Sequence, residues 1–117
     1  MRSSVVVLVV EDEILVRMVA VEALEDAGYS TLEAANADEA IQLLETHPEI
    51  RLVFTDVQMP GSMDGVKLAE AVRKRWPPVR LIVTSARPKP MLIEDAIFLP
   101  KPYDTLDLGR QVEAALQ

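Results

Sequence analysis

Apolar and polar residues follow two kinds of pattern along the chain, short runs of mainly β-branched residues and longer stretches with helical periodicity. The short runs predict five strands. The first is apolar at every position, which is typical of a central strand covered on both faces. Strands that alternate with helices predict a parallel α/β sheet. The predicted strands span residues 5–10, 30–34, 52–55, 80–84 and 97–99.

Four of the intervening stretches have the periodicity of an amphipathic helix. The first has an apolar stripe at Ile14, Met18, Val21 and Leu24, and Gly28 supplies a natural end for it. The other three stripes are Ala37, Ile41 and Leu44; Leu68, Ala69 and Val72; and Leu108, Val112, Ala115 and Leu116.

Polar residues and prolines set the expected ends of the helices. Asn36 followed three residues later by Glu39 is a capping-box pattern for the second helix, and Asp104 is positioned to cap the last one. Between residues 86 and 97, Pro88 and Pro90 each remove a backbone donor. A helix in that segment is therefore expected to be short, irregular or absent.

Composition narrows the class of protein and the available chemistry. The 117 residues correspond to one domain, and half of them are apolar, which is enough to bury a core. The formal net charge of −7 disfavours direct nucleic-acid binding. Cysteine is absent and His47 is the single histidine, which excludes disulfides, thiol catalysis and a histidine metal cluster. No apolar run approaches the roughly 20 residues needed to cross a bilayer, so we expect a cytoplasmic protein without a membrane partner.

Polar side chains follow four of the predicted strands, at the edge where ligands bind in sheets of this kind. Glu11 and Asp12 directly follow the first strand, and Asp56 directly follows the third. Thr84 ends the fourth strand, and Lys101 lies just beyond the fifth. Crowded carboxylates repel one another, and a divalent cation relieves that repulsion. Because oxygen ligands favour Mg²⁺ over zinc, the pattern predicts a magnesium site.

An ionised Asp56 beside such a metal is a nucleophile toward a phosphoryl group, with Lys101 and Thr84 as donors to the phosphoryl oxygens. A simpler interpretation remains open for residues 11–13, because acids that follow a strand are also common at helix N-termini.

Five short motifs occur in order along the chain: Val-Val-Glu-Asp-Glu (9–13), Thr-Asp-Val-Gln-Met-Pro (55–60), Met-Asp-Gly (63–65), Ile-Val-Thr-Ser-Ala (82–86) and Lys-Pro-Tyr (101–103). Each is weak evidence alone, but together they resemble the receiver domain of bacterial two-component response regulators over essentially the whole chain. The resemblance implies one receiver domain, residues 1–117, with a flavodoxin-like, doubly wound five-stranded parallel α/β sheet in the order 2-1-3-4-5 and helices on both faces.

The resemblance also implies roles for the acidic residues. Asp56 resembles the phosphoacceptor that takes a phosphoryl group from a partner's phosphohistidine. Asp12 resembles a direct Mg²⁺ ligand and Glu11 a ligand that acts through water, while Gln58 is expected to offer its backbone carbonyl to the metal.

Three further residues match the family's response to phosphorylation. Thr84 resembles the hydroxyl that swings toward the phosphoryl group, and Lys101 resembles the ammonium that pairs with it, with a cis bond to Pro102. Phe98 resembles the aromatic switch residue, although a strand aromatic is equally expected in partial core packing.

Two departures from the family pattern are visible. Gly61 and Ser62 fill the place of one residue, and the segment from Thr84 to Lys101 is shorter than the family norm by more than one helical turn. The second departure keeps the family's output surface from being transferred directly.

Phosphorylation-activated signalling by a stand-alone receiver, without turnover of a small substrate, is the leading hypothesis. Its expected partners are a sensor histidine kinase or a histidine phosphotransfer protein, an unidentified output protein and a second copy of the chain. A pseudo-receiver that works without phosphorylation is the alternative. A Mg²⁺-dependent aspartyl-phosphate phosphatase would need an Asp two residues after the nucleophile, where this chain has Gln58. A nucleotide-binding protein is disfavoured because no glycine-rich phosphate motif follows the first strand.

Overall fold

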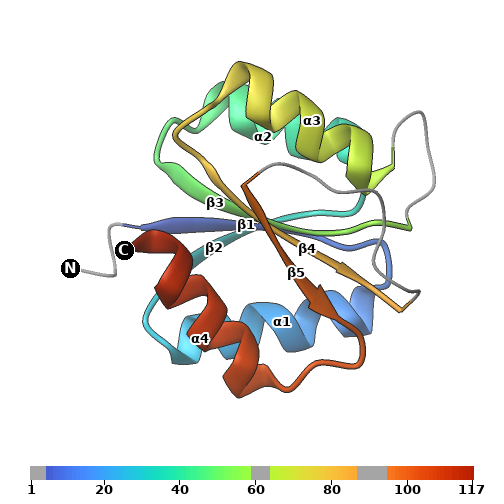
Figure 1. The fold of residues 1–117 in the computed structure, drawn as a ribbon, viewed down its shortest axis with the longest axis vertical. Coiled ribbons are helices and arrows are strands. Elements are labelled where there is room, and N and C mark those ends of the chain that lie inside the picture. The colour runs from blue at the N-terminus through green and yellow to red at the C-terminus, as the bar shows by residue number, and fades with distance from the viewer. Residues whose placement is uncertain (1–4, 59–63, 87–94) are drawn as a thin grey trace.

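Five parallel strands form a single sheet in the order β2-β1-β3-β4-β5 in the computed structural model, which describes residues 5–58, 64–86 and 95–117. This confirms the predicted fold class. The strands are β1 (Val6–Val10), β2 (Ser30–Ala34), β3 (Ile50–Asp56), β4 (Arg80–Ser85) and β5 (Ala96–Pro100). The helices are α1 (Ile14–Asp26), α2 (Ala37–Thr46), α3 (Gly65–Arg75) and α4 (Thr105–Leu116). Helices α2 and α3 cover one face of the sheet, and α1 and α4 cover the other (Figure 1).

Strand β1 supplies side chains to the core on both faces of the sheet, because successive residues of a strand point to opposite sides. Leu8 and Val10 belong to the core under α2 and α3, whereas Val7 and Val9 belong to the core under α1 and α4. All four side chains are at most 1% exposed. The unbroken apolar run therefore marks the centre of the sheet, as predicted.

Side-chain caps begin two helices where the sequence predicts them. The Asn36 side chain accepts a hydrogen bond from the Glu39 N–H, and Asp104 accepts one from the Leu106 N–H. The Glu39 carboxylate accepts from the N–H of Ala35, so the reciprocal bond of the capping box reaches one residue further than in the usual pattern.

The apolar stripe predicted for α1 is wrong at two of its four positions. Ile14 is 60% exposed and Met18 is 55% exposed, whereas Ala20 and Leu24 are buried against the sheet. The first half of α1 is apolar on nearly all sides, so its periodicity does not identify the buried face.

Strand β3 is longer than predicted at both ends because it pairs with β1 and β4 along its whole length. Its pairing with β1 shifts register between Val6 and Val7, where Arg51 is left out of the ladder. Ile50 is therefore buried under α2 and α3, while Leu52 is buried under α1 and α4.

The expectations for Gly61, Ser62, Pro88 and Pro90 lie outside the described residues, and so does most of the segment in which a short or irregular helix is predicted. In the part of the chain that the structure describes, no helix has the length and apolar character needed to span a membrane.

Candidate functional site

Three carboxylates meet at the carboxyl ends of β1 and β3. These strands are neighbours, and Val10 pairs with Thr55, so that the residues that follow come together at one edge of the sheet. Glu11, Asp12 and Asp56 each offer an oxygen within 4.8 Å of the oxygens of the other two. Glu11 and Asp56 are buried, and Asp12 is exposed. The structure thus brings together the acids that the sequence singles out.

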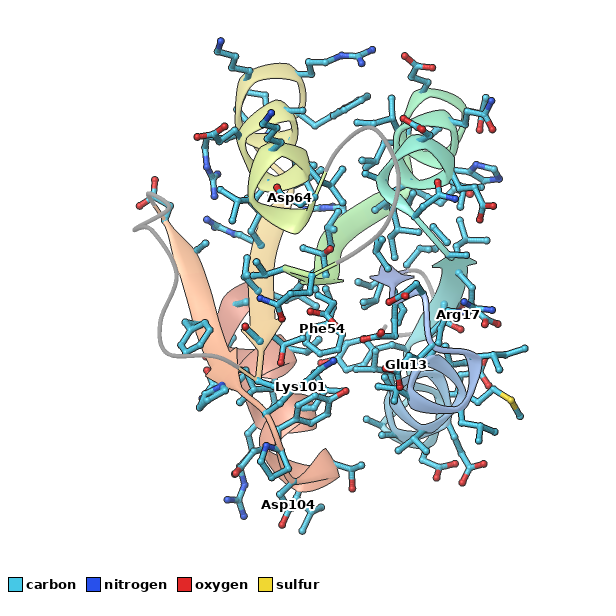
Figure 2. The ribbon with its side chains drawn as sticks, turned by 90° about the vertical axis from the view of Figure 1, so that its right-hand side faces the viewer. Glu13, Arg17, Phe54, Asp64, Lys101 and Asp104 are labelled. Carbon is cyan, nitrogen blue, oxygen red and sulfur yellow. The ribbon has the colours of Figure 1, made fainter. Side chains whose placement is uncertain are left out.

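Lys101 reaches this cluster from the end of β5. Its Nζ lies 2.6 Å from Asp56 Oδ2 and 3.0 Å from Glu11 Oε2. The Lys101 N–H donates to the Ser85 carbonyl, and the bond to Pro102 is cis, as predicted. The ammonium is therefore the counter-charge of the two buried carboxylates, and Figure 2 labels Lys101.

Burial and like charge perturb the titration of this cluster. Burial raises the pKa of Glu11 to about 7, the hydrogen bond from Lys101 lowers it in part, and the neighbouring Asp56 raises it further. Burial by itself would lower the pKa of Lys101, but its hydrogen bonds to Asp56 and Glu11 raise that pKa above the ordinary value. One ammonium is thus insufficient to keep both buried carboxylates fully ionised at neutral pH.

Thr84 lies one residue before the end of β4, beside Asp56, with which it pairs across β3 and β4. Thr84 is 1% exposed, and its Oγ1 has no hydrogen-bond partner among the described residues. A buried hydroxyl without a partner is uncommon and costs free energy, so a ligand oxygen that reached it would gain a donor. Phe98 lies on the neighbouring edge strand β5, half-buried and paired with Val83.

Gln58 lies next to the acceptor and is held by two contacts. Its backbone N–H donates to Asp56 Oδ1 at 3.0 Å, and its side-chain Oε1 accepts from the Ser85 hydroxyl at 3.2 Å. The Gln58 N–H therefore holds Asp56 Oδ1, while Lys101 holds Asp56 Oδ2.

The start of α3 fits tightly against the end of β3. Asp64 caps the helix by accepting from the Lys67 N–H, and the Gly65 N–H donates to the Val57 carbonyl. A Cβ atom built on Gly65 would lie 2.0 Å from the Asp56 carbonyl oxygen. Only glycine permits this approach, so residue 65 helps to fix the backbone of Asp56.

The donor set fits a magnesium ion. Oxygens that share one Mg²⁺ at about 2.1 Å lie at most about 4.2 Å apart, so carboxylate oxygens within 4.8 Å of one another need only small side-chain rotations. The described residues of the site offer oxygens and an amine but no imidazole or thiolate, which disfavours zinc. Glu11, Asp12 and Asp56 are the residues whose oxygens could hold the ion.

An exposed apolar surface adjoins the site. It comprises Ile14, Leu15, Met18 and Val19 of α1, which are between 54% and 73% exposed, and we refer to it as the α1 apolar patch. An open groove of about 710 Å³ runs from Leu15 and Val19 to Lys101 and Tyr103. A partner that covers the patch would therefore lie beside the carboxylates.

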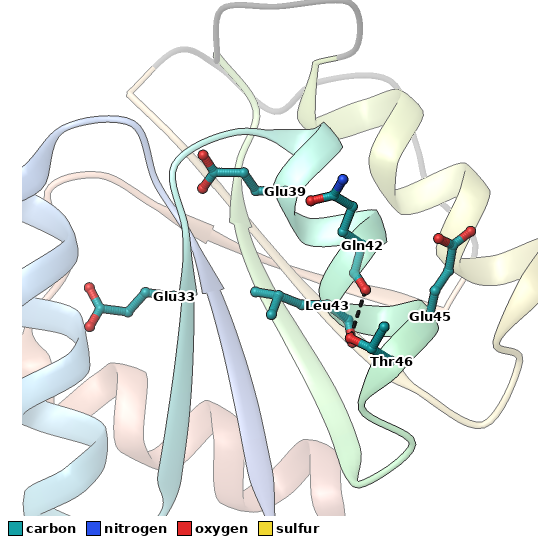
Figure 3. A pocket seen from close by; sticks show the side chains of 6 residues that line it. All are labelled: Glu33, Glu39, Gln42, Leu43, Glu45 and Thr46. Carbon is teal, nitrogen blue, oxygen red and sulfur yellow. Dashed lines mark hydrogen bonds between the residues drawn. The ribbon is translucent and has the colours of Figure 1, made fainter.

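A second hollow lies over α2 and β2 (Figure 3) and is lined by Glu33, Glu39, Gln42, Leu43, Glu45 and Thr46. Its carboxylates are bound by other groups: Glu33 by Arg17, Glu39 by the Ala35 N–H and Glu45 by Arg75. These contacts explain the acids structurally, and the hollow carries no candidate chemistry.

The sequence reasoning missed Arg17, which lies at the edge of the site. Its Nη1 donates to the Glu11 carbonyl at 2.7 Å, and its Nε donates to Glu33 Oε1 at 3.0 Å. The sequence could have singled out Arg17 because it is the one basic residue of α1 and follows the acids by about one helical turn.

Known proteins resemble this chain in sequence over most of its length. The family model described as "Response regulator receiver domain" matches residues 7–112. The chain is 38% identical to "Sensor kinase CckA" of Brucella abortus, a match that covers 97% of this chain and 13% of CckA. It is 38% identical to "Transcriptional regulatory protein PdtaR" of Mycobacterium tuberculosis, over 94% of this chain and 56% of PdtaR. The match to "Response regulator receiver protein CpdR" of Brucella abortus is 31% identical and covers 94% of this chain and 95% of CpdR.

Solved structures share the fold. The receiver domain from the hybrid histidine kinase CckA has a TM-score of 0.82 and 37% identity, and the match covers 96% of this chain and 99% of that one. A CheX-CheY-BeF3-Mg²⁺ complex from Borrelia burgdorferi has a TM-score of 0.85 and 26% identity, over 97% of this chain and 90% of that one. In the sequence matches, by contrast, the chain spans only 13% of the length of CckA and 56% of the length of PdtaR.

Proposed function

The chain belongs to the response regulator receiver domain family, and from that membership we propose that it is a phosphorylation-activated signalling module with Asp56 as the phosphoacceptor. The observation that carries the proposal is the environment of Asp56. This buried carboxylate has one oxygen bound to Lys101 and the other to a backbone N–H, and the hydroxyl of Thr84 is buried beside it without a hydrogen-bond partner among the described residues.

The proposed reaction transfers a phosphoryl group from a histidine of a partner protein. An Asp56 carboxylate oxygen attacks phosphorus, a P–O bond forms, and the P–N bond of the phosphohistidine breaks. The electron pair of that bond returns to the imidazole nitrogen. Mg²⁺ held by Asp12, Asp56 and the backbone carbonyl of Gln58, with Glu11 acting through water, would supply positive charge to the phosphoryl oxygens.

The chain's own donors complete the site. Lys101 exchanges its bond to Asp56 for one to a phosphoryl oxygen, which keeps a charge-assisted hydrogen bond in both states. Thr84 donates its hydroxyl to another phosphoryl oxygen and gains the partner it lacks. Thr84 in β4 pairs with Leu99, the residue that follows Phe98 on β5, and a coupled movement of Thr84 and Phe98 is the proposed route from the site to a partner-binding surface.

The α1 apolar patch offers a docking surface for the protein that delivers the phosphoryl group. The groove that adjoins the patch is lined by Leu15, Val19 and Lys101, so a protein seated there can bring a histidine to Asp56. We assign this surface to a sensor histidine kinase or a histidine phosphotransfer protein, in the cytoplasm.

Intact-mass measurement after incubation with a small acyl phosphate and Mg²⁺ tests the proposal. The wild-type protein should gain one phosphoryl group, and the gain should disappear with a chelator or in Asp56→Asn. Asp64→Asn is the matched control, because it removes a nearby carboxylate while an amide oxygen can still cap α3.

An unchanged mass in the wild-type protein would reject phosphorylation and favour a pseudo-receiver. Phosphorylation of Asp56→Asn to the wild-type extent would place the phosphoryl group on another residue.

A further inference from the structure

Arg17 connects three elements that meet at the acidic cluster. It lies in the second turn of α1, where its side chain is 15% exposed. Its Nη1 donates to the backbone carbonyl of Glu11, and its Nε binds the Glu33 carboxylate on the edge strand β2. Figure 2 shows Arg17 beside α1 and β2, and Figure 3 shows Glu33 extending from β2 toward α1.

The turn that Arg17 contacts has little else to fix it. Within the described structure, the Glu13 side chain makes no capping bond at the start of α1, and the Glu13 N–H donates to Glu11 Oε1 at 3.2 Å. The Glu11 N–H is bound to the Ala34 carbonyl, and the Arg17 guanidinium holds the carbonyl of the same residue. The Glu11 N–H belongs to the preceding peptide, whereas the Glu11 carbonyl belongs to the peptide that joins Glu11 to Asp12, so the bond from Arg17 sets the plane of that peptide.

We propose that Arg17 is a positioning residue for the metal site, which fixes the Glu11–Asp12 peptide so that both carboxylates stay within reach of Asp56. The inference rests on the proposed Mg²⁺ site. Glu33 has the supporting role of holding the guanidinium in the orientation that reaches the Glu11 carbonyl.

A purely electrostatic account makes the opposite prediction. A guanidinium beside the site repels a divalent cation, so its removal would strengthen Mg²⁺ binding if charge were its main effect. The loss of a positioning group weakens binding instead, typically by 10- to 100-fold for groups that orient metal ligands. The sign of the change in affinity therefore separates the two accounts.

Titration calorimetry with Mg²⁺ at pH 8 is the experiment, on the full chain and on two variants. Arg17→Met removes the donors and the charge but keeps an apolar stem, and its Mg²⁺ Kd should rise about 10-fold. Glu33→Gln is the matched control, because it removes a charge while its amide oxygen can still accept from Nε. Its Kd should stay within about 2-fold of wild type, whereas the charge account predicts weaker binding.

The magnesium dependence of phosphorylation by a small acyl phosphate gives a second readout. Arg17→Met should raise the Mg²⁺ concentration for half-maximal rate, while the rate at saturating Mg²⁺ stays within about 3-fold of wild type. A general loss of structure would lower both, and thermal unfolding without metal checks for it. If Arg17→Met does not fold, Arg17→Lys keeps the charge and replaces the two-pronged contact by one ammonium, and its Mg²⁺ affinity should also fall.

The outcomes distinguish this inference from the proposed function. Absence of Mg²⁺ binding in the wild-type protein would reject the metal site itself. Wild-type binding together with equal or tighter binding in Arg17→Met, or unchanged affinity in Arg17→Lys where that variant is used, would overturn the role of Arg17 alone.

Discussion

Magnesium binding should release a proton from Glu11 near neutral pH. In the metal-free protein, burial raises the pKa of this carboxyl to about 7, with Lys101 and Asp56 as the charged groups in contact with it. A divalent cation at the site favours the ionised carboxylate, so binding and deprotonation are linked. Changing the pH between 6 and 8 is therefore the perturbation that tests the charge balance of the site.

The size of the effect follows from that pKa. A group that titrates near 7 carries about 0.9 proton at pH 6, about 0.5 at pH 7 and about 0.1 at pH 8, and Mg²⁺ should displace that fraction. The apparent Mg²⁺ Kd should be about 11-fold larger at pH 6, and about 2-fold larger at pH 7, than its limit at high pH. The same shift also makes the free energy of unfolding of the metal-free protein depend on pH.

The sign of that dependence follows from which state of the protein, folded or unfolded, binds the Glu11 proton more tightly. The folded protein binds the Glu11 proton more tightly than the unfolded chain, in which this carboxyl has its ordinary pKa of 4.5. Stabilisation from this group is therefore complete below about pH 4.5 and is lost as the pH rises through about 7. The loss amounts to roughly 3 to 4 kcal/mol at most, because one pKa unit corresponds to about 1.4 kcal/mol.

Calorimetry in two buffers with different ionisation enthalpies measures the proton release, and urea unfolding at pH 5 and pH 8 measures the stability. Glu11→Gln is the control, since it removes the titrating group and should flatten both profiles between pH 6 and pH 8. A Mg²⁺ Kd that does not change from pH 6 to pH 8 would refute the reasoning. Equal proton release from Glu11→Gln would assign the titration to another residue.

Two further predictions concern the neighbours of Asp56. Lys101→Ala should leave the Mg²⁺ affinity equal to or tighter than that of wild type, because it removes a competing cation. It should also weaken the chemical-shift response to a phosphoryl mimic, because the ammonium pairs with the phosphoryl group. A parallel loss of Mg²⁺ affinity and of this response would show that Lys101 supports the metal. Gly65→Ala should destabilise the fold by at least about 2 kcal/mol in urea unfolding and reduce phosphorylation, because its Cβ would lie 2.0 Å from a backbone oxygen. Gly109→Ala is its control, since no atom lies within 4 Å of its added Cβ, and it should stabilise α4 by about 0.5–1 kcal/mol; similar effects of the two substitutions would contradict the close approach at Gly65.

The position of the site could be predicted from the sequence because two kinds of signal coincide. Apolar runs locate the strands, and the residues that end them, Asp56 and Thr84 among them, are polar. Parallel strands bring their carboxyl ends to one edge of the sheet, and the strand order that the family resemblance implies makes the first and third strands neighbours, so Glu11 and Asp56 are predicted to meet. The depth of burial and the bridging geometry of Lys101 required the structure.

Other features depend on packing that periodicity does not encode. The start of α1 is apolar on most sides, and only packing against the sheet decides that Ala20 is buried and Ile14 is exposed. The register shift at Arg51 sends Ile50 and Leu52 into different cores, although alternation alone would place them on one face. Arg17 binds a backbone carbonyl, and because every residue has one, the sequence does not indicate which carbonyl the side chain reaches.

The Thr84 hydroxyl is buried and makes no hydrogen bond to any of the described residues. A buried hydroxyl without a partner costs about 1–3 kcal/mol, and a phosphoryl oxygen within its reach would recover that amount. Lys101, by contrast, is satisfied before phosphorylation by Asp56 and Glu11, so its transfer to the phosphoryl group changes the partner more than the energy. If the proposed function holds, this difference predicts that Thr84 contributes more than Lys101 to the bias between the unphosphorylated and phosphorylated conformations. A gain of about 1–3 kcal/mol corresponds to a shift of about 5- to 150-fold in the equilibrium between them, which is the usual range of coupling between two sites of a protein.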